Sequence, residues 1–159
     1  MSRLLLSVLA IAVALLQVSA LAGLGSQATA VPLLPIALFA AWGATRGLDD
    51  LWVALPMGAV PLGLASDGRI GWFVIALLPT LALLMIFPAG SSFGRRIGMV
   101  TITSIAGASA FTVLMLLSQG TWPAMTESTA GAALMTAGLA VGTTCLLWPV
   151  RSRLLGLYE

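Results

Sequence analysis

Long runs of apolar residues, separated by short breaks rich in glycine, proline and polar side chains, constrain this chain more than any other feature. A helix needs roughly 20 apolar residues to cross a bilayer, so the 159 residues have room for about six crossings and no soluble domain. Only 8% of the residues are charged, whereas about a quarter is usual in water-soluble domains. The sequence therefore predicts an all-α, polytopic membrane protein in which residues 1–159 form a single integral membrane domain.

The apolar pattern divides into six predicted helical segments. The first follows Arg3 and resembles a signal peptide, with a possible cleavage site at Val18, Ser19 and Ala20, but its apolar run continues beyond that site, so we predict a span. The second and third segments are short and interrupted by prolines, which leaves two alternatives, tilted short helices or a re-entrant hairpin. The predicted segments are residues 4–24, 30–45, 51–65, 70–87, 97–117 and 130–150.

The arginines indicate an orientation. If the six segments alternate across the membrane, only Arg69 lies on the outer side, and cationic residues in loops favour the cytoplasmic side. We therefore expect both termini to be cytoplasmic, in a bacterial inner membrane. A re-entrant pair of segments would change only the side of Arg46, Asp49 and Asp50. The arginines expected on the cytoplasmic side are Arg3, Arg46, Arg95, Arg96, Arg151 and Arg153.

Groups that carry chemistry are scarce. The sequence contains no histidine, five acidic residues and one cysteine, Cys145, which we expect to be a small core residue. The usual general bases and metal ligands are therefore missing. We predict that the protein is not an enzyme and has no cofactor or metal site. The scattered arginines form no patch that would bind nucleic acid.

The stretch around the third segment combines prolines, glycines and charges. A proline inside a lipid-exposed helix leaves a carbonyl group unpaired, so Pro61, with Gly58 and Gly63 beside it, predicts that this segment is buried against other helices. Asp67 and Arg69 follow in a tight turn that we place on the outer face. They form either a solvated turn with a loose ion pair or a contact with a partner.

Small and polar residues mark the predicted contacts between helices. Gly138 and Gly142 form a GxxxG step, for which packing within the chain is favoured over packing against a partner. Gln17 needs a hydrogen-bond partner inside its apolar segment. Ser104, Ala108 and Thr112 predict a further packing face in the fifth segment. The tryptophans lie near segment ends and predict an aromatic belt at the membrane interface: Trp42, Trp52, Trp72, Trp122 and Trp148.

In order and length these features resemble the family of the bacterial rod shape-determining protein MreD. The first helix ends in ALLQ at residues 14–17, Pro32 opens the second segment, GAVPLGLASDGRIG runs over residues 58–71, and LLWPVRSRL at residues 146–154 closes the last helix on Pro149 and a basic tail. Two positions depart from the family. Its central aspartate would fall near Leu62 or Gly63, so it is either missing or replaced by Asp67 after a shift, and its asparagine before the closing proline is missing.

The resemblance implies a non-catalytic membrane component of the cell-elongation machinery. Its expected partners are the lipid bilayer, a single-span protein like MreC, and the wall-synthase pair of a polymerase and a penicillin-binding protein. The implied fold is a compact six-helix bundle like the substrate-capture subunits of energy-coupling-factor transporters. Two alternatives are such a capture subunit, binding a vitamin-type molecule, and an accessory subunit of a respiratory or photosynthetic complex.

Overall fold

Six α-helices and no strand make up the part of the chain that the computed structural model describes, residues 2–24, 32–65, 70–87, 92–118 and 127–154. The predicted all-α fold is therefore confirmed for these residues. Four helices begin at a different residue from the predicted one: α2 begins four residues later, and α1, α5 and α6 begin two, four and three residues earlier. The helices are α1 (Ser2–Leu24), α2 (Leu34–Arg46), α3 (Leu51–Ala65), α4 (Ile70–Ile86), α5 (Phe93–Ser118) and α6 (Glu127–Leu154).

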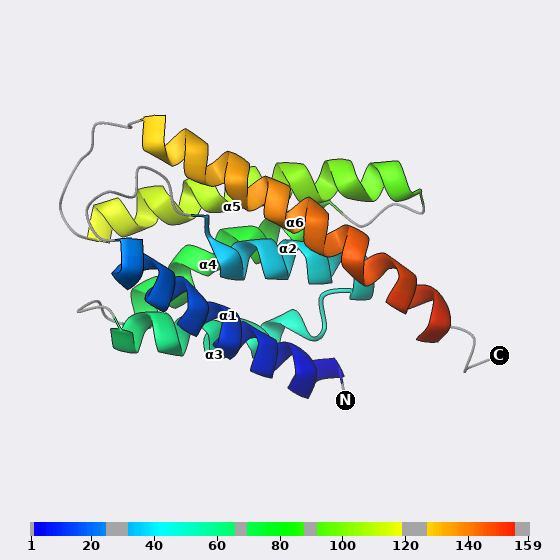
Figure 1. Ribbon diagram of the computed structural model, residues 1–159, viewed down its shortest axis with the longest axis horizontal. Helices are drawn as coiled ribbons and strands as arrows, with labels where there is room; N and C mark the ends of the chain where they lie inside the picture. Colours follow the sequence, from blue (N-terminus) through cyan, green and yellow to red (C-terminus); the bar gives the residue numbers. More distant parts are fainter. Residues whose placement is uncertain (1, 25–31, 66–69, 88–91, 119–126, 155–159) are drawn as a thin grey trace.

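Consecutive helices run in opposite directions along the long axis of the molecule (Figure 1). The central element is α2, which touches each of the other five helices. In the view of Figure 1, α1 and α3 lie on one side of α2, and α5 and α6 lie on the other. The first turn of α1 and the last turn of α6 are consequently at the same end of the bundle.

The sequence of α2 explains its central position. Every residue from Pro35 to Thr45 is buried, and the first charged side chain of the helix is Arg46 at its end. A helix without a polar face belongs in the interior, and small residues on several faces let neighbouring backbones approach closely. The small residues of α2 are Ala37, Ala40, Ala41, Gly43 and Ala44.

The third segment is buried against other helices on one face only, so the prediction for this segment is confirmed in part. Helix α3 buries only one face, which includes Leu55, Gly58 and Leu62, and exposes Trp52 and Met57 on the opposite face. It contacts chiefly α1 and α4 at the edge of the bundle. Pro61, on which the prediction rested, is partly buried, whereas Pro56 lies on the exposed face.

Large apolar side chains cover much of the described surface, while the interior contains hydroxyl groups. Leu4 and Leu146, for example, are 75% and 76% exposed. The buried hydroxyls of Thr103, Ser104 and Thr144 donate hydrogen bonds to carbonyl groups of their own helices. So many exposed large apolar side chains are unusual for a water-soluble protein, in which exposed leucines are scattered singly.

Two of the described helices are long and apolar enough to cross a membrane. The qualifying stretches are Phe93–Met115 in α5 and Ala130–Trp148 in α6, whereas α1, α3 and α4 contain shorter apolar stretches. A helix of about 15 residues extends only about 22 Å, less than the thickness of a typical hydrocarbon core. Six complete crossings therefore stay a prediction.

Thr80 in α4 carries a buried hydroxyl that has no hydrogen-bond partner among the described residues. An unpaired buried hydroxyl costs about 1–3 kcal/mol. Thr80→Val removes this hydroxyl and keeps the shape of the side chain. We expect it to raise the free energy of unfolding by about 1 kcal/mol, measured by thermal unfolding of the purified protein in detergent.

Thr103→Val is the matched control for Thr80→Val, because the equally buried Thr103 hydroxyl already donates to the Met99 carbonyl at 2.8 Å. We expect this control variant to be no more stable than the original chain. If Thr80→Val lowers the free energy of unfolding as much as Thr103→Val does, the Thr80 hydroxyl has a hydrogen-bond partner.

Candidate functional site

The N-terminus of α2 is partly buried, and side chains from two other helices accept hydrogen bonds from its backbone N–H groups. The first N–H groups of a helix have no acceptor within the helix. The Leu33 N–H donates to Thr136 Oγ1 of α6 at 2.9 Å, and the Leu34 N–H donates to Gln17 Oε1 of α1 at 2.8 Å. The next residue, Pro35, has no N–H to satisfy. Gln17 is only 3% exposed, so its predicted role in an interhelical hydrogen bond is confirmed.

The C-terminal end of α2 receives a charged side chain from α5. Arg96 is buried, and its Nη1 donates to the Ala44 carbonyl oxygen at 2.9 Å. A positive charge is favourable beside the last carbonyls of a helix. The guanidinium also lies 5.6 Å from the centre of the Trp148 ring, which packs edge-to-face against Phe93. This end of α2 is therefore joined to both α5 and α6.

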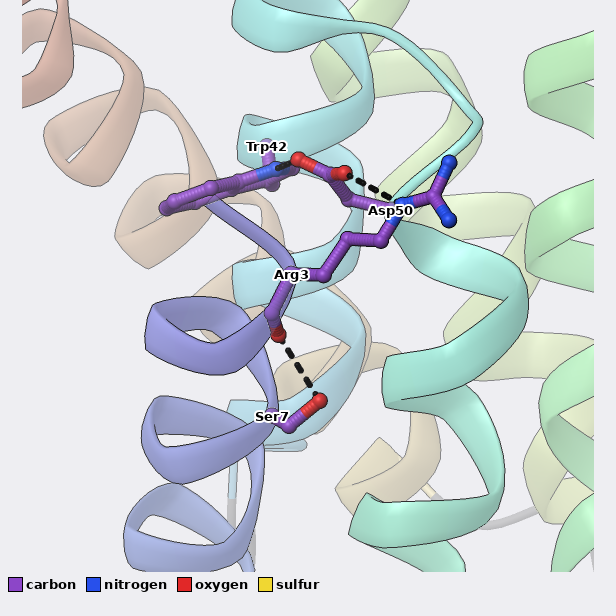
Figure 2. Close-up of polar contacts among 4 residues, drawn as sticks. All are labelled: Arg3, Ser7, Trp42 and Asp50. Atoms are coloured by element: carbon purple, nitrogen blue, oxygen red, sulfur yellow. Dashed lines mark hydrogen bonds and ion pairs between the residues drawn. The ribbon is translucent and has the colours of Figure 1, made fainter. Parts of the chain in front are cut away.

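A second polar contact at the same end joins α1 to the loop between α2 and α3 (Figure 2). Arg3 Nε lies 3.5 Å from Asp50 Oδ1, and the Trp42 indole N–H donates to Asp50 Oδ2 at 3.4 Å. In Figure 2 the Asp50 carboxylate lies between the Trp42 ring and the Arg3 side chain, while the Ser7 hydroxyl donates to the Arg3 carbonyl. Such partly exposed ion pairs contribute at most about 1 kcal/mol.

Trp42 is not part of an aromatic belt, because it is almost fully buried. Its indole N–H points to Asp50, and the Arg46 guanidinium lies over its ring, 4.7 Å from the centre. A large aromatic ring near the end of a segment fits both the interface and the core, provided that its N–H finds a partner. Trp52 and Trp72 are exposed, as the prediction requires.

The predicted glycines of α3 lie where helices approach closely. A Cβ atom added to Gly58 would lie 3.2 Å from Phe39 Cζ of α2 and 3.6 Å from Ala10 Cβ of α1. A Cβ atom added to Gly63 would lie 2.8 Å from Ile70 Cα, at the start of α4. Both glycines therefore serve packing within the chain, as their spacing predicts.

The GxxxG step of α6 faces outward, contrary to the expectation of packing within the chain. Gly138 and Gly142 are exposed, and a Cβ atom added to either would meet no atom within 4 Å. Cys145 on the same helix is exposed too, so it is not the core residue that we expected. These residues leave a free outer face on α6.

The remaining predicted site residues lie outside what the structure describes. Asp67 and Arg69 belong to residues 66–69, which the structure does not describe, and Pro149 lies in α6 with its side chain outside the description. The described candidates form no single cluster. Gln17 lies at the N-terminus of α2, Gly58 and Gly63 lie along α3, and the α6 glycines face outward.

Sequence reasoning missed the groups that close the ends of α2. Thr136 and Arg96 carried no signal of their own, because five of the six predicted segments contain hydroxyl side chains and Arg95 precedes Arg96 as an equivalent anchor. Among the described residues, no group of three histidine, cysteine or acidic side chains could hold a metal ion. These contacts fix the position of the central helix, because side chains of α1, α5 and α6 bind its two ends.

Comparisons with protein-family models, with curated proteins and with solved structures found no match to this chain. The resemblance to the MreD family therefore depends only on the residues quoted above.

Proposed function

We propose that this chain is a non-catalytic membrane scaffold of the bacterial cell-elongation machinery, with six crossings of the inner membrane and both termini in the cytoplasm. The observation that carries the proposal is the placement of its side chains. Bulky apolar residues and a bare GxxxG step face outward, while the buried polar groups bond mostly to the chain itself. A protein built in this way offers helix surfaces for binding and few groups for reaction.

The location in a membrane is supported by the apolar exterior and by the gathering of arginines at one end. The Arg3–Asp50 pair brings the start of α1 beside the end of α2, and Arg96 brings the start of α5 to the same place. Positive side chains at one end of a helical bundle favour the cytoplasmic side. The antiparallel order of the helices agrees with alternating crossings (Figure 1).

The outer face of α6 is the proposed contact with a partner. Without side chains at Gly138 and Gly142, a helix of another protein can bring its backbone close to α6. Exposed Leu139 and Leu146 lie on the same helix and would add apolar contact. The partner class, a single-span protein like MreC together with wall-synthase membrane proteins, comes from the family resemblance.

Gly138→Leu combined with Gly142→Leu is expected to lower recovery of the partner about tenfold, the effect of losing roughly 1–2 kcal/mol of helix packing. The measurement is affinity purification of the tagged full chain from its native membrane in mild detergent, followed by quantitative mass spectrometry. Because both positions are open, the substitutions should leave the fold and the amount of protein in the membrane unchanged.

Gly71→Leu is the matched control, since Gly71 is also exposed and open but lies on α4. Unchanged partner recovery in the α6 variant, or an equal loss in the control, would contradict the proposed α6 contact. Recovery of paired ATPases with a coupling protein would favour the transporter alternative. Recovery of electron-transfer subunits would favour the accessory role in a respiratory or photosynthetic complex.

A further inference from the structure

An open groove of about 450 Å³ lies between the end of α4 and the first turns of α5. Its α5 wall follows from helix periodicity, because positions 95, 98, 99 and 102 have the i, i+3, i+4, i+7 spacing of one helix face. The groove belongs to the arginine-bearing end, where Arg96 reaches the Ala44 carbonyl. The lining residues are Ile86, Phe87, Arg95, Gly98, Met99 and Ile102.

The lining of the groove is mostly apolar and suits a hydrocarbon chain. Ile86 and Ile102 are 68% and 59% exposed, and no other helix of the described chain covers them. Gly98 has no side chain, and a Cβ atom added there would meet no atom within 4 Å, so the middle of the groove is open. A linear apolar chain fits such a channel better than a compact polar molecule does.

Arg95 supplies one positive charge at this groove. Its side chain is exposed and has no hydrogen bond or ion pair with any described residue, in contrast to Arg96, which is buried against Ala44. The groove lining contains no carboxylate that would neutralise Arg95. The positive end of the α5 dipole adds to the attraction for an anion, because Arg95 lies in the first turn.

We infer that this groove binds an anionic phospholipid, with the phosphodiester on Arg95 and one acyl chain along Ile86, Met99 and Ile102. In a bilayer, moving an acyl chain from other lipids into the groove gains little, because both surroundings are apolar. Selectivity must therefore come from the headgroup and its charge-assisted contact with the guanidinium. The inference depends on the proposed membrane location and does not depend on the α6 partner.

The test uses the purified full chain equilibrated with vesicles made of equal parts of phosphatidylglycerol and phosphatidylcholine. Native mass spectrometry after detergent extraction then counts each lipid that stays bound. We expect the original chain to retain phosphatidylglycerol preferentially and Arg95→Gln to lower that retention about fivefold, the effect of one arginine near an anionic headgroup. Gly98→Leu fills the groove without changing its charge, and it should lower retention as well.

Arg46→Gln is the matched control, because Arg46 belongs to the same end but lies over Trp42, outside the groove. It should retain phosphatidylglycerol as the original chain does. Equal retention of the two lipids by the original chain, or full retention by Arg95→Gln, would overturn the inference. Displacement of the lipid by glycerol phosphate would also overturn it, because the site would then bind a headgroup only. A dimer mass that Gly98→Leu abolishes would overturn it too, because a second copy of the chain would then fill the groove.

A separate experiment tests the membrane location on which the lipid site depends. Alkaline carbonate extraction of native membranes releases proteins that do not span the bilayer. A chain released by this treatment would remove both the scaffold proposal and the lipid site. A chain that stays in the membrane but shows no preference for phosphatidylglycerol would remove only the lipid site.

Discussion

Gly107→Ala is expected to lower the free energy of unfolding by about 2 kcal/mol, because the crossing of α4 and α5 has no room for a methyl group at this position. An added Cβ atom would collide with the Thr80 hydroxyl and would lie 3.2 Å from Thr80 Cβ and 3.4 Å from Ile36 Cγ2. The gain in helix propensity from glycine to alanine, about 1 kcal/mol, offsets only part of this cost. Thermal unfolding of the purified protein in detergent measures the difference.

A second substitution separates the collision from other effects of Gly107→Ala. Thr80→Ala removes the hydroxyl that the new methyl group would strike, so the double variant should be more stable than the two single effects predict, by at least about 0.5 kcal/mol. Gly138→Ala is the control, because the added methyl group meets open space on α6. It should be neutral or slightly stabilising. A loss in Gly138→Ala equal to that in Gly107→Ala would contradict the packing argument.

The helices could be predicted from hydropathy, because each described element is an apolar run bounded by glycine, proline or charged residues. Leu51–Ala65 was predicted without error, and Ile70–Ile86 was predicted to within one residue. The start of α2 was placed too early, because the apolar run extends through residues 30–33 while Pro35 favours a helix that begins beside it. Hydropathy identifies the apolar run, but it does not show which backbone N–H groups have acceptors and therefore where the helix begins.

The position of each helix in the bundle was harder to predict. Pro61 and its neighbouring glycines predicted that α3 is buried against other helices, but only one face of α3 is buried, and Pro56 lies on the exposed face. Alanine content was the better signal, since the small residues of α2, such as Ala37 and Ala41, let several neighbours approach. Gly138 and Gly142 were wrongly predicted to pack within the chain. A GxxxG step indicates a surface for close helix approach, but it does not indicate whether the partner helix belongs to the same chain.

Arg95 and Arg96 show why single side chains at the candidate sites could not be assigned from sequence. Successive residues of a helix point about 100° apart, so one of the two arginines reaches Ala44 inside the bundle and the other faces the open groove. The rotation of α5 is set by its packing against α4 and α6. Two adjacent arginines in a loop-like stretch contain no information about that rotation.

Gln17→Leu is expected to lower the free energy of unfolding by about 1–3 kcal/mol, because it leaves the partly buried Leu34 N–H without an acceptor. The extra apolar surface of leucine does not compensate, since Gln17 is already packed among neighbours and almost fully buried. Thr136→Val should have an effect of similar size, because the Thr136 hydroxyl accepts the Leu33 N–H while it donates to the Ala132 carbonyl. Both variants are measured by thermal unfolding in detergent.

The two caps act on neighbouring N–H groups of one helix end but come from different helices, α1 and α6. Once either cap is lost, the start of α2 can loosen and admit water, so removal of the second cap should cost less than it does alone. Thr143→Val is the control, because its hydroxyl only donates to the Leu139 carbonyl of its own helix; it should change stability by less than about 0.5 kcal/mol. If Gln17→Leu is tolerated as well as this control, the Leu34 N–H has another acceptor, and α1 is held to the central helix by apolar packing and the Arg3–Asp50 contact alone.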